Sequence, residues 1–389
     1  MSDLKDDFNK NMKKVAELEA LKTDTAAKKA VLDNKRVSSQ LEQVEQNERD
    51  MAIARNTNYG ALTQEQILDI QKNNDEYMEA AKFAMTFIIP KFDNLVPFFR
   101  KNFILVGART GEGKSTAVAN IAFTTMQEKN KATGKLRRVL VLTNEERAED
   151  FYNRITSLIN GWHYTNHSKF TQQQRDMFHK MIPLLAAGGR LTVIDNNHNG
   201  SHGVTTSIEG IATVFDNLIA NQEYYDVILI DYYQNIIHSQ KYPHWSENEV
   251  QAKLSRMMDK YKNAYPAPIV MMAQINPPDK DDKIPFQHRI KGRKIIMDPA
   301  TFAVEMIRDT KLQMTKWVIH KSRFTEAIGQ DLKTGYDKGK FVEYTSAFAT
   351  KVQTAAYERE ARKLNQQIDQ NNGLPDVFKK DEEKKEEPK

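Results

Sequence analysis

The chain has 389 residues, of which 28% are charged, 40% hydrophobic and 9% aromatic, with a formal net charge of +5. This length accommodates one large α/β domain of roughly 250 residues plus an appendage, and the small charge permits nucleic-acid binding through a local basic patch without requiring it. The chain contains no cysteine, which excludes disulfides and thiolate zinc sites, and no signal peptide or membrane-length apolar run, so we expect a soluble cytoplasmic protein with no membrane partner.

Residues 1–58 form a charged segment that contains neither proline nor glycine. Its apolar residues recur three and four positions apart, which predicts one or two long amphipathic helices with a narrow buried stripe. Two interpretations stay open at this point. The segment is either an arm that binds a partner or another subunit, or a solvated helix with no partner.

Residues 59–85 are predicted to be a helical linker, because Thr63 and Gln66 have the spacing of a capping box. We place a globular core at 86–350. A helix and a charged tail follow at 351–389, and the last 13 residues carry too little apolar surface to fold.

A glycine-rich turn follows the apolar strand Phe103–Val106 and precedes a segment with helical spacing, 117–122. This context is typical of a phosphate-binding loop, in which backbone N–H groups, Lys114 and the helix N-terminus hold ATP phosphates and Ser115 binds Mg²⁺. Alanine occupies the first glycine position of the usual pattern, and a chance glycine-rich turn is the alternative. The predicted nucleotide-binding residues are Ala108, Arg109, Thr110, Gly111, Glu112, Gly113, Lys114, Ser115 and Thr116.

Apolar strands alternate with helical segments through the core. This order predicts an α/β fold with a mainly parallel, doubly wound sheet and ligands at the carboxyl ends of its strands. Antiparallel strands should follow. The predicted parallel strands are 103–106, 138–143, 191–194, 226–231 and 268–273, and the antiparallel ones are 302–307, 314–320 and 340–345.

Three strand ends carry residues suited to ATP hydrolysis. Asp231 could hold the Mg²⁺ shell beside Ser115, its alternative being an ordinary strand-end carboxylate. The residue after Asp231 is Tyr232 and not a glutamate, so the general base must come from another strand. Glu145 is the candidate base and Glu146 is its rival, although Glu146 could instead form only a surface ion pair. Gln274 ends the fifth strand and could sense the γ-phosphate, or only cap a turn.

Lys321 and Arg323 place two cations on one face of a strand. At a subunit edge they could reach a neighbour's ATP. Nucleic-acid contact, or an exposed edge made soluble by charge, explains them equally well.

Together these motifs resemble the RecA-like ATPase domain of the replicative DnaB-type helicases over about residues 86–345. Ala108–Ser115 is similar to the family's Ala-Arg-x-x-x-Gly-Lys-Thr loop, and Leu142–Glu145 to its Phe-Ser-x-Glu segment. Ile230–Gln234 resembles Asp-Tyr-Leu-Gln, and Ala273–Asn276 resembles Ser-Gln-Leu-Asn. Lys321–Arg323, with Ile-Gly after it, resembles Lys-Gln-Arg followed by Ile-Gly.

The resemblance implies Glu145 as the catalytic base, Asp231 and Ser115 at Mg²⁺, Gln274 as the sensor, and Arg323 as a finger acting in trans with help from Lys321. It also implies a homo-oligomeric, usually hexameric ring that binds ATP between subunits and single-stranded DNA in its channel. The setting would be a bacterial or phage-infected cell. The family's helical collar domain and a primase module are not recognisable, so loader and primase contacts cannot be carried over.

Basic loops beyond the fourth and fifth strands are the candidate DNA site, with solvated loops as the alternative. The first loop contains Lys241, Tyr242, His244 and Trp245. The predicted DNA-binding residues of the second are Arg289, Lys291, Arg293 and Lys294.

The sequence thus favours an ATP-dependent, ring-forming helicase motor that translocates on single-stranded DNA, 5′ to 3′ as in the family. A RecA- or RadA-like recombination ATPase and a nucleotide-switched loading or scaffold protein are the alternatives. The arm and the tail are the candidate contact segments for replication proteins such as a primase, a loader or a single-strand-binding protein.

Overall fold

The computed structural model describes residues 62–163, 169–197, 203–277, 284–292 and 294–371. The chain falls into two compact units, 1–73 and 74–389, so the end of the predicted linker belongs to the same unit as the core. Helix α2 (Gln64–Ala81) begins at the predicted capping box, where Thr63 and Gln66 exchange backbone-to-side-chain hydrogen bonds of 2.9 and 3.2 Å. The predicted arm at 1–58 and the end of the tail lie outside the described residues.

The described residues of the second unit contain one nine-stranded sheet with the order β3-β2-β4-β5-β1-β6-β7-β8-β9. The six strands from β3 to β6 in that order run parallel, and β7 to β9 continue the sheet in antiparallel pairs. This confirms the predicted α/β class. The prediction that 302–307 belongs to the antiparallel strands is wrong on one side, because β6 runs parallel to β1 and antiparallel only to β7. The strands are β1 (Phe103–Ala108), β2 (Val139–Thr143), β3 (Leu191–Ile194), β4 (Val227–Asp231), β5 (Ile269–Gln274), β6 (Phe302–Asp309), β7 (Met314–Ser322), β8 (Asp331–Asp337) and β9 (Lys340–Glu343).

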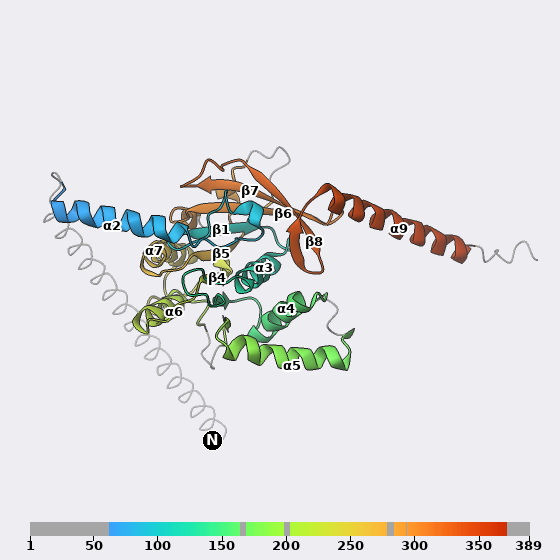
Figure 1. Ribbon diagram of the computed structural model, residues 1–389, viewed down its shortest axis with the longest axis horizontal. Helices are drawn as coiled ribbons and strands as arrows, with labels where there is room; N and C mark the ends of the chain where they lie inside the picture. The colour runs from blue at the N-terminus through green and yellow to red at the C-terminus, as the bar shows by residue number, and fades with distance from the viewer. Residues whose placement is uncertain (1–61, 164–168, 198–202, 278–283, 293, 372–389) are drawn as a thin grey trace, which may run out of the picture. The chain divides into compact units, whose positions relative to one another are not determined.

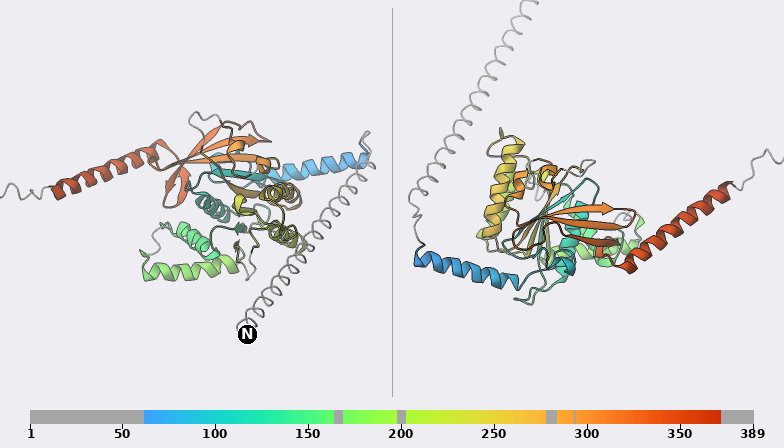
Figure 2. Two further views of the ribbon diagram at one scale, coloured as in Figure 1. Left: turned by 180° about the vertical axis from the view of Figure 1, so that it is seen from behind. Right: turned by 90° about the horizontal axis from the view of Figure 1, so that it is seen from above.

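Helices cover both faces of the parallel strands (Figures 1 and 2). Alternate strand residues such as Val106 and Val141 pack toward α3 (Lys114–Gln127), α4 (Ala148–Asn160) and α5 (Gln172–Ala187). Their neighbours, such as Leu105 and Leu142, pack toward α6 (Ile208–Ala220) and α7 (Glu247–Ala264). Because both faces are buried, the strands are continuous apolar runs, which is why the sequence identified them.

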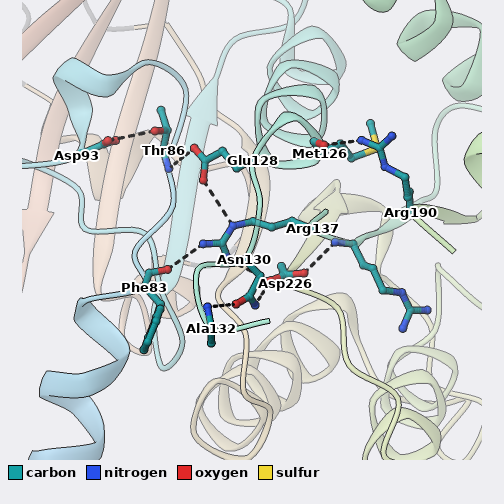
Figure 3. Close-up of polar contacts among 11 residues, drawn as sticks. Phe83, Thr86, Asp93, Met126, Glu128, Asn130, Ala132, Arg137, Arg190 and Asp226 are labelled. Carbon is teal, nitrogen blue, oxygen red and sulfur yellow. Dashed lines mark hydrogen bonds and ion pairs between the residues drawn. The ribbon is translucent and has the colours of Figure 1, made fainter. Parts of the chain in front are cut away.

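The start of the core is tied to the sheet through Arg137, whose side chain is 4% exposed (Figure 3). Its guanidinium donates to Asp226 Oδ1 at 3.0 Å and to the Phe83 carbonyl at 3.1 Å. Glu128, at the end of α3, lies 3.5 Å from Arg137 Nε and accepts from the Thr86 N–H at 3.0 Å. One buried cation therefore joins the segment that enters the core, the end of α3 and the start of β4.

The antiparallel hairpin of β8 and β9 packs over α3. Asn120 of α3 donates to the Gly339 carbonyl and accepts from the Phe341 N–H, each at 2.9 Å. The sequence did not predict β8, because it lacks an apolar alternation. Its Gly335 lies where a Cβ would approach the Phe348 ring to 2.5 Å, so close packing explains the glycine.

The sequence analysis did not predict helix α5. The remaining described elements are the C-terminal helix and four short helices. The helix that follows β9 is α9 (Ser346–Asn371), in agreement with the predicted C-terminal helix. The short helices are η1 (Pro90–Phe92), η4 (Tyr233–Asn235), α8 (Phe286–Arg289) and η5 (Lys294–Met297).

Candidate nucleotide and DNA site

The phosphate loop connects β1 to α3 as the sequence predicts. Gly113 is the N-cap of α3 with a φ of 96°, and Gly111 has a φ of 80°; both lie in the left-handed region that glycine adopts without strain. Lys114 begins the helix and is 8% exposed. The loop therefore offers a helix N-terminus and a largely desolvated cation to the same anion.

Glu112 folds back over the loop. Its carboxylate accepts from the Arg109 backbone N–H at 2.9 Å and from Arg109 Nε at 2.6 Å, and the residue is 8% exposed. This pair holds the loop in its turn conformation, so Arg109 and Glu112 contribute to the shape of the loop.

Asp231 ends β4 beside the loop and is 1% exposed. Burial raises the pKa of Asp231, and a hydrogen bond with Ser115 lowers it. Burial has the larger effect, so the pKa is raised to about 6. Its Oδ1 is buried and has no hydrogen-bond partner among the residues that the structure describes. A buried, unsatisfied carboxylate oxygen next to a loop hydroxyl fits the donor set that Mg²⁺ prefers, so the two residues predicted to bind the metal lie together.

Replacing Asp231 with asparagine should stabilise the nucleotide-free protein at pH 7.5. The folded state binds the carboxyl proton more tightly than the unfolded state, because burial raises the pKa. Stability should therefore fall as pH rises through the window from about 4 to about 6, by about 3 kcal/mol in total, and Asp231→Asn removes this loss. Urea denaturation between pH 4.5 and 7.5 measures it, with Asp337→Asn as an exposed control. An Asp231→Asn protein less stable than wild type at pH 7.5 would contradict the explanation.

The two glutamates that follow β2 have different surroundings. Glu146 pairs with Arg154 at 2.7 Å, and burial raises the pKa of the Glu146 carboxyl. Glu145 is exposed at the same strand end, and its charge contributes to the raised pKa of Asp231. The ion pair occupies Glu146, whereas Glu145 is the carboxylate open to a water at the phosphate site.

Gln274, at the end of β5, contacts the phosphate loop directly, since its Nε2 donates to Thr110 Oγ1. Gln234 fixes the backbone of Gln274 from the other side. The Gln234 amide accepts from the Gln274 N–H at 2.8 Å, donates to the Gln274 carbonyl at 3.0 Å and donates to the Lys291 carbonyl at 2.8 Å. Thus one amide links the predicted sensor to the basic segment beyond it.

Arg308 on β6 is a site residue that the sequence analysis missed. Its Nη1 lies 3.7 Å from the position of a Cβ on Gly113, and its guanidinium lies 5.0 Å from the Tyr336 ring centroid. The sequence predicted β6 as an antiparallel strand, whereas β6 runs parallel to β1, so no local signal placed Arg308 beside the phosphate loop.

Lys321 and Arg323 lie together at the opposite end of the sheet from the phosphate loop. Lys321 Nζ donates to the carbonyls of Met297 and Asp298 at 2.5 and 3.1 Å, and Arg323 Nη2 donates to the Asp298 carbonyl at 2.5 Å. Burial and the Arg323 charge lower the pKa of Lys321. A hollow of about 840 Å³ adjoins Lys321 and is also lined by His320 and Lys294.

The sequence model of the DnaB-like helicase C-terminal domain matches residues 86–337. The chain belongs to the DnaB-like helicase family. Comparison with curated protein sequences gives no match.

Two solved structures share the fold of this DnaB-like domain. One, described as an ATPase domain, is 15% identical with a TM-score of 0.55, over 72% of this chain and 99% of that one. The other, the structure of a DnaB-like replicative helicase and its interactions with primase, is 14% identical with a TM-score of 0.56, over 80% of this chain and 77% of that one. Both support the RecA-like fold.

In the DnaB-like domain, the four residues predicted to bind DNA do not behave as one set. Arg289 is 5% exposed and makes a bidentate ion pair with Glu305 at 2.7 and 2.5 Å, and His320 bonds the same carboxylate at 2.8 Å. The prediction for Arg289 is therefore wrong in this conformation, because its guanidinium is already bound inside the sheet. Lys291 and Lys294 are exposed, and Arg293 lies outside the described residues.

The loop after β4 has a stacked aromatic pair. The ring centroids of Tyr242 and Trp245 lie 4.3 Å apart at an interplanar angle of 14°, and Lys241 and His244 beside them are exposed.

Among the helices that the structure describes, none is long and apolar enough to cross a membrane.

Proposed function

We propose that this chain is the ATP-hydrolysing motor subunit of a ring-shaped replicative DNA helicase. Family membership supports the helicase activity, and the strand-end chemistry supports Mg²⁺-dependent hydrolysis of ATP. The proposed ring is a hexamer that moves 5′ to 3′ on single-stranded DNA. Lys114 binds the phosphates, Ser115 and Asp231 hold Mg²⁺, Glu145 accepts the proton of the attacking water, and Gln274 senses the γ-phosphate.

The position of the cation pair is the observation that carries the ring. Lys321 is level with Ala303 and Leu105 in the sheet, whereas the phosphate loop begins after Ala108. Arg323 lies further still from the loop, with its N–H on the Thr301 carbonyl. The four residue steps from Ile104, which is level with Ser322, to Ala108 span about 13 Å, so Arg323 cannot serve its own nucleotide. We assign it to the ATP held by a neighbouring subunit, with Lys321 beside it.

The nucleotide base has a candidate platform in the same subunit. Arg308 and Tyr336 form a cation–π pair, and Arg308 also lies next to Gly113 at the start of α3. A planar guanidinium and an aromatic ring are both surfaces on which adenine stacks. We propose that the base rests against this pair.

We propose that Lys291 and Lys294 contact the DNA backbone. Lys291 N–H donates to the Gln274 carbonyl at 2.9 Å, so this segment is fixed to the residue that touches the phosphate loop. Movement of Gln274 on hydrolysis would therefore move the proposed DNA contact with it.

The assignment to the DnaB-like helicase family argues against the two alternative functions, a recombination ATPase and a nucleotide-switched scaffold protein.

The test is ATP hydrolysis and unwinding with and without single-stranded DNA. We expect DNA to stimulate the wild type, and Lys291→Ala/Lys294→Ala to weaken binding and reduce the slope of log affinity against log salt by about 0.7 per lysine. Lys131→Ala/Lys135→Ala removes the same charge from exposed positions before β2 and should leave the slope unchanged. Hydrolysis indifferent to DNA would refute the helicase function, whereas an unchanged slope would refute only the two contacts.

A further inference from the structure

We propose that Asn144 is a positioning residue for hydrolysis, whose side-chain amide fixes the base Glu145 relative to the metal carboxylate Asp231. The inference rests on the proposed function and deepens it. No motif in the sequence pointed to this residue. The role follows from where its hydrogen bonds go.

Asn144 extends the pairing of β2 and β4 by one residue. The last register pair of the two strands is Thr143 with Asp231, and the Asn144 N–H continues it by donating to the Asp231 carbonyl at 2.8 Å. Beyond this point the side chain replaces the backbone. Asn144 Oδ1 accepts from the Tyr232 N–H at 3.0 Å, and Nδ2 donates to the Tyr232 carbonyl at 3.0 Å.

A third segment holds the same amide. Asn144 Nδ2 also donates to the Thr205 carbonyl at 3.2 Å, and Thr205 Oγ1 donates to the Thr143 carbonyl at 2.9 Å. The Tyr232 ring in turn lies 5.3 Å from Lys114 Nζ. Asn144, which lies between the end of β2 and the base, is thus bonded to the backbone of Asp231, to the backbone of the tyrosine beside the phosphate-loop lysine and to the segment before α6.

Only a carboxamide makes these contacts, because they need one acceptor and one NH₂ donor in the same plane. Leucine has a similar size without either group, and alanine removes the side chain while the backbone bond to Asp231 stays. Misplacing a catalytic group by about 1 Å costs about 100-fold in rate. ATP binding should change little, because the phosphates are held by the loop and Lys114 rather than by Asn144.

The experiment compares Asn144→Leu and Asn144→Ala with Asn130→Leu in the full-length oligomer on single-stranded DNA. Asn130 is a matched control: it is half-buried, its Nδ2 donates to Asp226 Oδ1 at 3.0 Å and its Oδ1 accepts from the Ala132 N–H at 2.9 Å, at the opposite end of the sheet (Figure 3). We expect both Asn144 variants to lose at least about 30-fold in kcat, with less than about a threefold change in the Kd of a fluorescent ATP analogue. Asn130→Leu should change neither by more than about twofold, as for a substitution remote from the chemistry.

A double-mutant cycle tests the route through the base. In a Glu145→Gln background, Asn144→Leu should cost no further loss in single-turnover hydrolysis of radiolabelled ATP, because the group that it positions is gone. A full additional loss, an unchanged kcat, or an equal loss of ATP binding would each overturn the inference. If Glu145→Gln itself leaves turnover intact, Glu145 is not the base and the inference fails with that assignment. If only the Asn144 variants leave turnover intact, the proposed function stands without this residue, and hydrolysis indifferent to DNA would refute the proposed function itself.

Discussion

Glu145→Gln should reduce ATP turnover by about a thousandfold while leaving ATP binding intact. The amide has the size of the carboxylate but cannot accept the proton of the attacking water. Nucleotide binding should survive because the loop and Lys114 would hold the phosphates, and Ser115 and Asp231 would hold Mg²⁺, without Glu145. The measurements are single-turnover hydrolysis on single-stranded DNA and titration with a fluorescent ATP analogue.

Glu146→Gln is the matched control, since it makes the same change one residue away. Glu146 is engaged by Arg154 at 2.7 Å, and burial raises the pKa of its carboxyl, so it serves the fold around α4. We expect its kcat to change by less than about threefold, with a lower unfolding midpoint from the broken pair. If the two results were exchanged, Glu146 would be the base and the assignment of the exposed carboxylate would be wrong.

Local patterns were sufficient to predict the phosphate loop, the parallel strands β1 to β5 and the residues at their carboxyl ends. Each parallel strand is an uninterrupted apolar run, and functional groups come at its carboxyl end, so the sequence positions of Asp231 and Gln274 already implied their place in space. The same reasoning could not find β8 or Arg308. The sequence of β8 lacks the alternation of apolar and polar residues that identifies a strand. Arg308 comes close to Gly113 only because β6 pairs with β1, which the sequence does not reveal.

Two side chains show what long-range contacts decide. Arg289 belonged to a basic run that suggested DNA, yet Glu305 on β6, whose carboxylate also bonds His320 on β7, holds Arg289 inside the protein. Asn144 carried no signal at all, because its partners at Tyr232 lie 88 positions away in the sequence. Burial and pairing of polar groups depend on strand order, which a single stretch of sequence does not contain.

Arg323→Ala and Lys114→Ala should each reduce DNA-stimulated turnover by about a thousandfold or more, since an arginine finger supplies about 10³–10⁵ in rate and the phosphate-loop lysine holds the substrate. Mixing the two inactive proteins before ring assembly should restore activity. An Arg323→Ala subunit has an intact phosphate loop, and a Lys114→Ala neighbour supplies an intact finger. With equal amounts and random order, about a quarter of interfaces combine the two intact halves, which sets the upper limit of recovery.

The matched control is a mixture of Lys114→Ala with Glu145→Gln. Lys114 starts α3 and Glu145 follows β2, next to β4, so both belong to the half of the site that one subunit provides. Every interface in this mixture carries one of the two defects, and no recovery is expected. Recovery in the first mixture and none in the second would locate Arg323 on the neighbour. Full turnover by Arg323→Ala alone would instead leave the cation pair with the structural role that its bonds to the Met297 and Asp298 carbonyls describe, because the register already separates the pair from its own nucleotide.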